Sequence, residues 1–203
     1  MISFQKRFLF VHIPKTAGNS IQSVLQQYSE DQIVRTRARQ DGVERFGVTN
    51  PIYPLKKHST LADYRAALND EQFHGLYKFT CVRNPWDRLV SYYFGTGERP
   101  VKWDPDAFAG MVTNVTSAAD YLRLGKEADP FKNVNRILRF ENLAEDFRSV
   151  CHELNISPAS LPAINRSSHG DYAKYYDDQL RVLVAQKFAS EIERFGYAFV
   201  SKG

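Results

Sequence analysis

Two short apolar runs, each followed by a loop and an amphipathic segment, place the strongest limit on what this chain can fold into. The first run, residues 7–12, reads Arg-Phe-Leu-Phe-Val-His and has the length and composition of a buried strand. Pro14 and Gly18 mark the loop that follows it. Apolar residues then recur with the spacing of one buried helical face, at Ile21, Val24, Leu25 and Tyr28. The segment therefore predicts a strand, a loop and a helix, in that order.

A second unit of the same kind starts with the apolar run at residues 76–82, which suits a central strand. Asn84 followed by Pro85 is typical of a helix start, with the asparagine as the cap and the proline in the first turn. Ser59 is the expected cap of another helix. Further patterns predict strands near residue 33 and at 136–140, and helices over residues 60–68, 106–112, 117–124, 143–154 and 177–195.

The alternation of strands and helices is typical of an α/β protein. We expect a P-loop-like three-layer fold, in which a central parallel sheet is flanked by helices. A length of 203 residues suits one domain with a real core, so we expect a single domain over residues 1–203. With 43% hydrophobic and 25% charged residues, the composition is that of an ordinary globular protein and argues against a disordered chain.

Composition also bears on compartment and partners. No run of about 18 apolar residues is present, so we expect neither a membrane span nor a signal peptide. Cys81 and Cys151 lack the spacing of a zinc site and are interpreted as reduced, buried thiols. These features favour the cytoplasm, unless the chain is an excised catalytic domain. The net charge of +4 favours anionic ligands, but the basic residues form no run, so no nucleic-acid partner is expected. The oligomeric state is not indicated.

The loop at residues 12–20 lies where α/β folds bind anions, between the carboxyl end of a strand and the start of a helix. It reads His-Ile-Pro-Lys-Thr-Ala-Gly-Asn-Ser. The lysine can reach a phosphate as a point charge, and the glycine eases a tight turn that offers backbone N–H groups. The residues expected to bind a 5'-phosphate are Lys15, Thr16, Ala17, Gly18, Asn19 and Ser20.

This loop is not a Walker A motif, which would need Gly, four residues and then Gly-Lys-Ser/Thr, and no nearby aspartate pattern indicates a magnesium site. It instead resembles the 5'-phosphosulfate loop of sulfotransferases that use 3'-phosphoadenosine 5'-phosphosulfate (PAPS). The resemblance is greatest to carbohydrate O-sulfotransferases of the heparan and dermatan 2-O type and to their bacterial relatives. The family usually has Thr or Ser where this chain has Asn19, so one hydroxyl contact differs.

A second motif, at residues 79–92, strengthens the resemblance. It reads Phe-Thr-Cys-Val-Arg-Asn-Pro-Trp-Asp-Arg-Leu-Val-Ser-Tyr and is similar to the family's 3'-phosphate motif, an arginine at a strand end with a serine eight residues on. Arg83 offers a forked donor, and Ser91 follows about two helical turns along, so both side chains can face one phosphate. The resemblance implies that these two residues hold the 3'-phosphate.

Weaker resemblances extend over nearly the whole chain. Residues 137–143 are similar to the next strand-to-helix segment of the family, and residues 165–176 and 195–197 resemble its C-terminal region. The loop at 155–171 is long, and long ordered loops are often functional. The candidates in this loop for contacting the 3'-phosphate, with an ordinary polar loop as the alternative, are Arg166, Ser167 and Ser168.

The expected chemistry is transfer of a sulfuryl group by in-line displacement, which needs a stabilised leaving group and a base near the acceptor hydroxyl. We assign the first role to Lys15, whose ammonium needs no metal, and the second to His58, whose segment resembles the one that supplies the base in carbohydrate sulfotransferases. PAPS would be the donor and adenosine 3',5'-bisphosphate (PAP) the product, with no metal required. A saccharide or glycolipid hydroxyl is the expected acceptor, and a small hydroxylated metabolite would fit almost as well. An acidic saccharide would suit the cations Arg35, Arg37, Arg39, Lys56 and Lys57.

Two other functions stay open. A nucleotide or nucleoside kinase of the P-loop type would share the general fold, and it predicts magnesium-dependent binding of ATP. A non-catalytic module that binds an anionic nucleotide or a sulfated glycan would need the phosphate-binding residues but no base. The loop sequence disfavours the kinase because the Lys-Ser/Thr pair is missing.

Overall fold

A four-stranded sheet forms the centre of the protein. The computed structural model describes residues 1–35, 46–96, 102–157, 160–162 and 170–200. The strand order is β1-β2-β5-β6; β2, β5 and β6 run parallel, and β1 runs antiparallel to β2. The strands of this sheet are Ile2–Ser3 (β1), Phe8–Val11 (β2), Tyr77–Val82 (β5) and Arg136–Arg139 (β6). A separate antiparallel pair is formed by β3 (Gln32–Arg35) and β4 (Phe46–Thr49).

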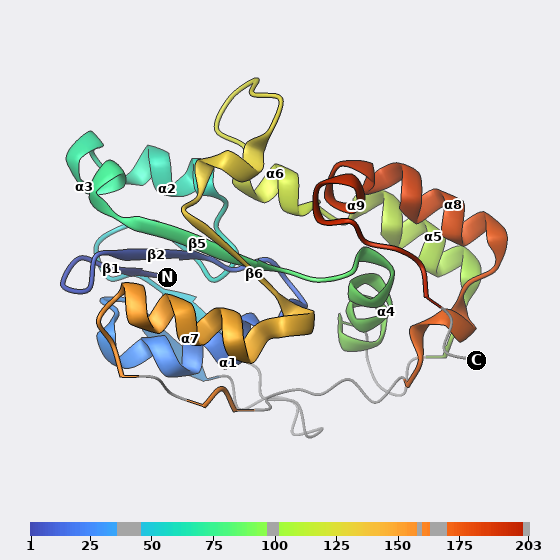
Figure 1. The fold of residues 1–203 in the computed structure, drawn as a ribbon, viewed down its shortest axis with the longest axis horizontal. Coiled ribbons are helices and arrows are strands. Elements are labelled where there is room, and N and C mark those ends of the chain that lie inside the picture. Colours follow the sequence, from blue (N-terminus) through green and yellow to red (C-terminus); the bar gives the residue numbers. More distant parts are fainter. Residues whose placement is uncertain (36–45, 97–101, 158–159, 163–169, 201–203) are drawn as a thin grey trace.

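Helices cover both faces of the sheet and extend beyond the carboxyl end of β5 (Figure 1). One face carries α1 (Gly18–Leu25) and α7 (Leu143–Glu153). The other carries α2 (Leu61–Ala67), α3 (Asp70–Gly75) and α6 (Ala118–Leu122). Beyond the sheet lie α4 (Pro85–Thr96), α5 (Pro105–Asn114), α8 (Asp178–Lys187) and α9 (Ala189–Phe195). Short 3-10 turns are η1 (Gln26–Tyr28), η2 (Pro130–Asn133), η3 (Phe140–Asn142) and η4 (Tyr172–Tyr175). The predicted α/β fold, a parallel sheet between helices, is confirmed.

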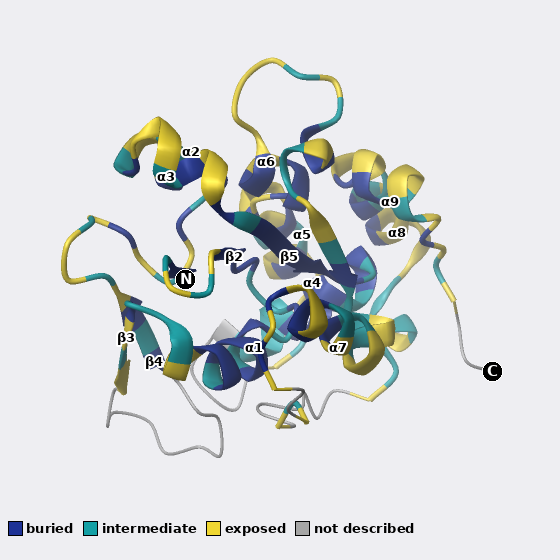
Figure 2. Ribbon diagram, turned by 60° about the vertical axis from the view of Figure 1, so that its left-hand side comes forward, coloured by how far each residue is buried: buried dark blue, intermediate teal, exposed yellow. Residues whose placement is uncertain are grey.

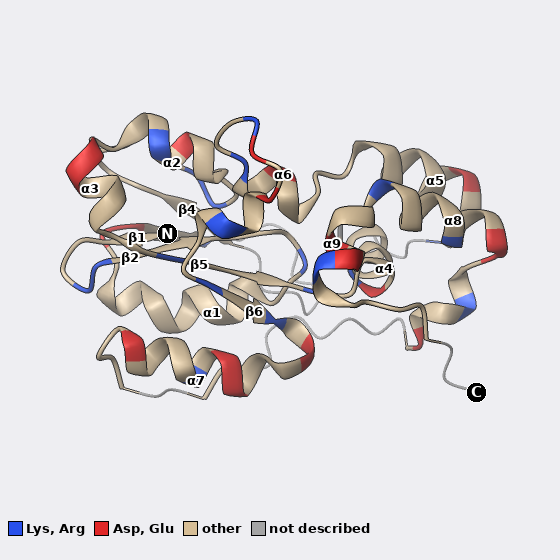
Figure 3. Ribbon diagram, turned by 45° about the horizontal axis from the view of Figure 1, so that its top comes forward, with Lys and Arg blue, Asp and Glu red and all other residues tan. Residues whose placement is uncertain are grey.

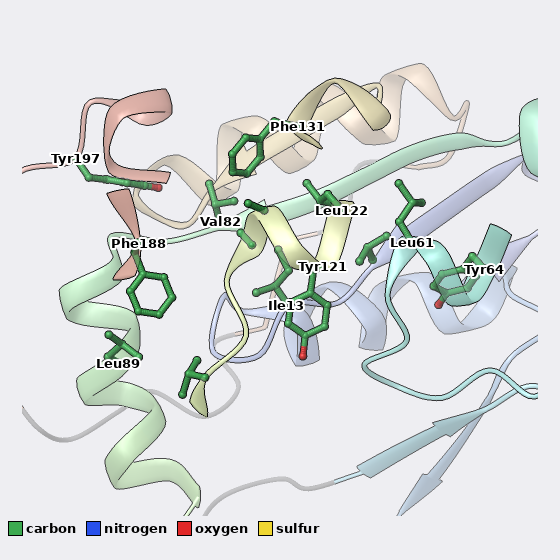
Figure 4. Close-up of a cluster of buried hydrophobic side chains, with 14 of the residues drawn as sticks. Ile13, Leu61, Tyr64, Val82, Leu89, Tyr121, Leu122, Phe131, Phe188 and Tyr197 are labelled. Carbon is green, nitrogen blue, oxygen red and sulfur yellow. The ribbon is translucent and has the colours of Figure 1, made fainter. Parts of the chain in front are cut away.

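Alternating side chains of the central strands separate two hydrophobic cores. Leu9 and Val11 of β2 face one core, with side chains from α2, α4, α5, α6 and α8. Phe8 and Phe10 of the same strand face the other core, with α1 and α7. Figure 4 shows part of the first core, in which Ile13 from the loop after β2 is fully buried. The start of the predicted phosphate-binding loop is therefore anchored in the core.

Most predicted helices and strands lie within two residues of their observed positions, but several details differ, and β4 and α3 were not predicted. The segment predicted as one helix over residues 177–195 is divided at Phe188, whose ψ of 25° is not helical and whose ring is buried. The cap of α2 is Thr60, which accepts a hydrogen bond from Asp63 N–H, rather than Ser59. The antiparallel strand β1 was not predicted, because two residues carry no periodicity.

The surface agrees with the expected distribution of polar residues. Buried residues concentrate in the central strands, whereas the helices expose their outer faces (Figure 2). Lys and Arg are spread over many elements (Figure 3). Both cysteines are buried and neither forms a disulfide, as predicted. Among the helices of the described residues, none combines the length and the apolar composition needed to cross a membrane.

Candidate active site

The loop between β2 and α1 has the shape of an anion-binding turn. Lys15 and Ala17 both adopt left-handed backbone conformations, with φ of 70° and 66°, which non-glycine residues adopt rarely and often at functional sites. The first helical hydrogen bond of α1 runs from Ile21 N–H to the Ala17 carbonyl at 3.2 Å. The N–H groups of residues 18–20 therefore have no acceptor within the helix, and they form the positive end of its dipole.

Gly18 lies directly against the ring of His12, and this contact sets the shape of the loop. A Cβ atom at residue 18 would lie 1.9 Å from Cδ2 and 2.0 Å from Nε2 of the His12 ring. The ring is only 4% exposed and stacks on Phe10, with 6.0 Å between the centroids. Burial lowers the pKa of His12 well below its usual range, and the nearby His58 and Lys57 lower it further. His12 is therefore neutral at physiological pH.

Arg83 connects the second motif to this loop. Its Nη1 donates to the Lys15 carbonyl at 3.2 Å, and its Nε and Nη2 lie 2.8 and 2.7 Å from Asp87 Oδ2. The guanidinium carbon lies 4.1 Å from the centroid of the Phe140 ring. Ser91 follows on α4, one turn after Asp87, and is buried. Because β2 and β5 are parallel neighbours, both predicted phosphate-binding motifs lie at the same edge of the sheet.

Arg88 ties α4 to the underside of the same loop. Its Nε donates to the Pro14 carbonyl at 3.1 Å, and its Nη2 donates to the Thr116 carbonyl at 2.9 Å. Glu191 Oε2 lies 4.0 Å from Nη1, and both side chains are almost fully buried. Burial raises the pKa of Glu191 and lowers that of Arg88, although each charge partly offsets the effect on the other. The cost of removing both charges from water thus offsets part of their mutual attraction, while the two hydrogen bonds from Arg88 fix the position of the loop.

His58 reaches the end of β2 from the segment before α2. Its Nδ1 lies 3.0 Å from the His12 carbonyl, and the two rings are 4.5 Å apart. Since a carbonyl oxygen only accepts, Nδ1 carries the proton in this contact and Nε2 has the lone pair. Partial removal of the ring from water lowers the pKa of His58. The hydrogen bond to the His12 carbonyl raises this pKa, and the positive charge of Lys57 lowers it further. The side chain is neutral and can accept a proton at Nε2.

The structure brings several of the predicted site residues together, with two qualifications. Lys15 and Arg83 are in direct contact, and Ser20 lies in the first turn of α1. The Thr16 hydroxyl is buried and donates to the Ile13 carbonyl at 2.8 Å, so it closes the loop from inside and leaves only the backbone of this residue for an anion. The predicted residues that lie outside the described part of the chain are Arg37, Arg39, Arg166, Ser167 and Ser168.

Sequence reasoning missed two residues that shape the site. Arg88 has a local signal, because a charged residue there interrupts the apolar face expected next to Leu89. Gly95, near the end of α4, lies against the Lys15 side chain: a Cβ atom at this glycine would be 2.1 Å from Lys15 Nζ. That contact joins residues 80 positions apart in the sequence, so no local sequence pattern could predict it.

Comparison with known proteins decides the family. A family model described as "Sulfotransferase family" matches residues 1–198. The chain belongs to the sulfotransferase family. The structure of this sulfotransferase is similar to that of mouse sulfotransferase SULT7A1 complexed with PAP, at 16% identity and a TM-score of 0.50, over 95% of this chain and 87% of that chain. This similarity shows a shared fold. A sulfotransferase from Alicyclobacillus acidocaldarius matches 67% of this chain and 58% of its own, at 18% identity and a TM-score of 0.34. No curated protein matches the sequence.

The predicted enzyme class is thereby confirmed. Backbone N–H groups, an ammonium and a guanidinium gather at one edge of the sheet, and all of them attract anions. A neutral histidine lies beside them. Within the described ranges, no group of three or more His, Cys, Asp or Glu side chains is arranged to hold a metal ion.

Proposed function

We propose that this sulfotransferase moves a sulfuryl group from PAPS to a carbohydrate hydroxyl and releases PAP. The observation that carries the proposal is the 3.2 Å hydrogen bond from Arg83 Nη1 to the Lys15 carbonyl, because it holds two anion-binding motifs side by side. A nucleotide with phosphate groups at both its 5' and 3' positions fits such a pair. The mouse sulfotransferase of similar fold is complexed with PAP, which supports the same ligand.

The two ends of the nucleotide would meet different donors. The N–H groups of residues 18–20 and the Lys15 ammonium suit the 5' end, where a helix start and a point charge act together. Arg83 and Ser91 suit the 3'-phosphate. Asp87 fixes the orientation of the guanidinium through Nε and Nη2, which reduces the freedom that Arg83 would lose on binding.

The transfer would proceed by direct displacement. PAPS supplies an activated sulfuryl group, and breaking its S–O bond leaves negative charge on the 5'-phosphate. The Lys15 ammonium stabilises that charge as it develops, without a proton transfer. His58 Nε2 accepts the proton of the acceptor hydroxyl while the hydroxyl oxygen forms its bond to sulfur. The sulfated acceptor, PAP and a protonated His58 are the products of this step.

The contact between His58 and the His12 carbonyl supports the role of base. It fixes the tautomer with the proton on Nδ1, so Nε2 need not lose a proton before it can act. The lowered pKa of His58 keeps the ring neutral in the physiological range. A base that is already neutral and already oriented saves reorganisation in the transition state.

Charged residues near the hairpin of β3 and β4 favour an acidic saccharide as the acceptor. Lys56 is exposed and lies two residues before His58. Its backbone pairs with Thr49, so the segment that contains His58 lies beside the end of β4. Arg35, at the end of β3, is exposed as well. Lys57 contributes less, because its Nζ donates to the Phe46 carbonyl at 2.6 Å. Carboxylate or sulfate groups on a sugar chain would interact favourably with Lys56 and Arg35.

The decisive experiment compares two nucleotides in calorimetric titrations. We expect metal-free binding of PAP that is much tighter than binding of Mg-ATP. Arg83→Ala should weaken PAP binding by at least about 100-fold, since it removes a charged donor to the 3'-phosphate and the bond to the Lys15 carbonyl. A preference for Mg-ATP would reject the proposal in favour of a kinase.

Turnover tests the base and the acceptor. His58→Ala should abolish transfer from labelled PAPS while the Kd for PAP stays within about threefold, because the base contacts the acceptor and not the nucleotide. Full activity of this variant would place the base elsewhere. Binding of PAP with no transfer to any hydroxyl compound would indicate a non-catalytic module. A screen of sulfated, carboxylated and neutral saccharides, with glycolipids as a further set, identifies the acceptor class.

A further inference from the structure

The side chain of Lys15 ends against a glycine of α4. A Cβ atom built on Gly95 would lie 2.1 Å from Lys15 Nζ and 3.0 Å from Cε, so the ammonium occupies the space that any other residue would need for its side chain. Gly95 is the last residue but one of the helix. The C-terminal carbonyls of a helix carry partial negative charge, and this end therefore attracts an ammonium.

Helix α4 and the residues just before it contact both the backbone and the ammonium end of Lys15. The Lys15 carbonyl accepts from Arg83, two residues before the helix, and Arg88 in the first half of the helix donates to the Pro14 carbonyl. The ammonium reaches Gly95 at the far end. The backbone of the lysine is thus fixed by two arginines, and the position of its charge depends on the space above the glycine.

We propose that Gly95 is a positioning residue for sulfuryl transfer. Because glycine has no side chain, it leaves the space that the Lys15 ammonium occupies. The inference rests on the proposed role of Lys15. An alanine methyl would force the ammonium from 2.1 Å out to at least the ordinary contact of 3.4 Å, a displacement of more than 1 Å. Displacements of about 1 Å at a reacting centre can lower rates by about 100-fold.

The fold itself should accept the substitution. The atom in the way is the far end of a flexible side chain, which can swing aside at little cost. Alanine is also the better helix former, so Gly95→Ala should keep or raise the melting temperature. A loss of activity in this variant would then report the displaced ammonium and not a damaged fold.

The experiment compares Gly95→Ala with a matched control. Gly110 lies within α5, and a Cβ atom there would meet no atom within 4 Å, so Gly110→Ala introduces the same change in a helix without touching the site. For Gly95→Ala we expect kcat for transfer from PAPS to fall by about 10- to 100-fold. The Kd for PAP should rise by a smaller factor than kcat falls, because the displaced ammonium is one of several donors to the nucleotide, and Arg83 and the helix N–H groups stay in place. Gly110→Ala should match the unmodified protein in both measurements.

A double substitution shows whether the effect passes through the lysine. In a Lys15→Met background the ammonium is gone, and adding Gly95→Ala should lower the residual activity no further. Full activity of Gly95→Ala, or an equal loss in both backgrounds, would overturn the inference while leaving the proposed function intact. Full activity of Lys15→Met would overturn the role of Lys15 and, with it, this inference.

Discussion

Replacing Gly18 with alanine should dismantle the phosphate loop. The added methyl would lie 1.9 Å from Cδ2 of the His12 ring, whereas ordinary contacts begin at 3.4 Å, so the two groups must separate by about 1.5 Å. The ring cannot supply this movement, because it is 4% exposed and packed between Phe10 and His58. The start of α1 must therefore move away, and the N–H groups of residues 18–20 move with it.

The size of the effect follows from that displacement. A hydrogen bond of about 2.9 Å that lengthens by about 1.5 Å is broken. Each bond to a charged group contributes about 1.5–3 kcal/mol, so losing two of them weakens PAP binding by about 3–6 kcal/mol, or at least about 100-fold. Overpacking should lower the free energy of unfolding by about 1–3 kcal/mol, partly offset by about 1 kcal/mol from the better helix propensity of alanine.

Titration with PAP and urea unfolding measure the two effects. Gly110→Ala is the control for the change of residue alone, and it should leave the Kd for PAP unchanged and raise the free energy of unfolding by up to about 1 kcal/mol. In a His12→Ala background the ring is absent, so adding Gly18→Ala should cost much less PAP affinity than it does in the unmodified protein. A folded Gly18→Ala variant that binds PAP within threefold of the unmodified protein would refute the steric reasoning.

Three further predictions concern charge. Because the pKa of His12 is lowered in the folded state, the stability linked to it is complete above pH 6.5 and is lost as the pH falls. The free energy of unfolding in urea should therefore be lower at pH 5.5 than at pH 7.5, and His12→Gln should reduce that difference by about 1 kcal/mol, whereas an unchanged difference would contradict this assignment. The pKa of His58 is lowered as well, so kcat/KM should rise through a midpoint below pH 6.5 and be level above it, and a midpoint above pH 7 would contradict this assignment. Arg88→Met should lower the free energy of unfolding in urea by about 3–5 kcal/mol, because the Pro14 and Thr116 carbonyls lose their donor and Glu191 loses its counter-charge. A loss below about 1 kcal/mol would show that water reaches the pair.

Local patterns were sufficient to predict a candidate anion site at the strand ends. An apolar run followed by a loop and a helical face predicts a strand end with an anion site, wherever it occurs in an α/β fold. Lys15 and Arg83 are predicted site residues on this basis, because Arg83 directly follows its strand and Lys15 lies in the loop after the first strand. The single helix predicted over residues 177–195 was wrong because both halves are helical by propensity, and the break at Phe188 depends on burying that ring in the core.

The sequence by itself determined the order of the elements, the fold class and the two motifs, because periodicity, capping residues and loop composition act over a few neighbouring residues. Only the tertiary structure decided what those motifs touch. The His12 ring under Gly18, the His58 bond to the His12 carbonyl and the Lys15 ammonium over Gly95 all join residues from different elements. Such contacts depend on how the helices pack against the sheet, and packing is a property of the whole chain.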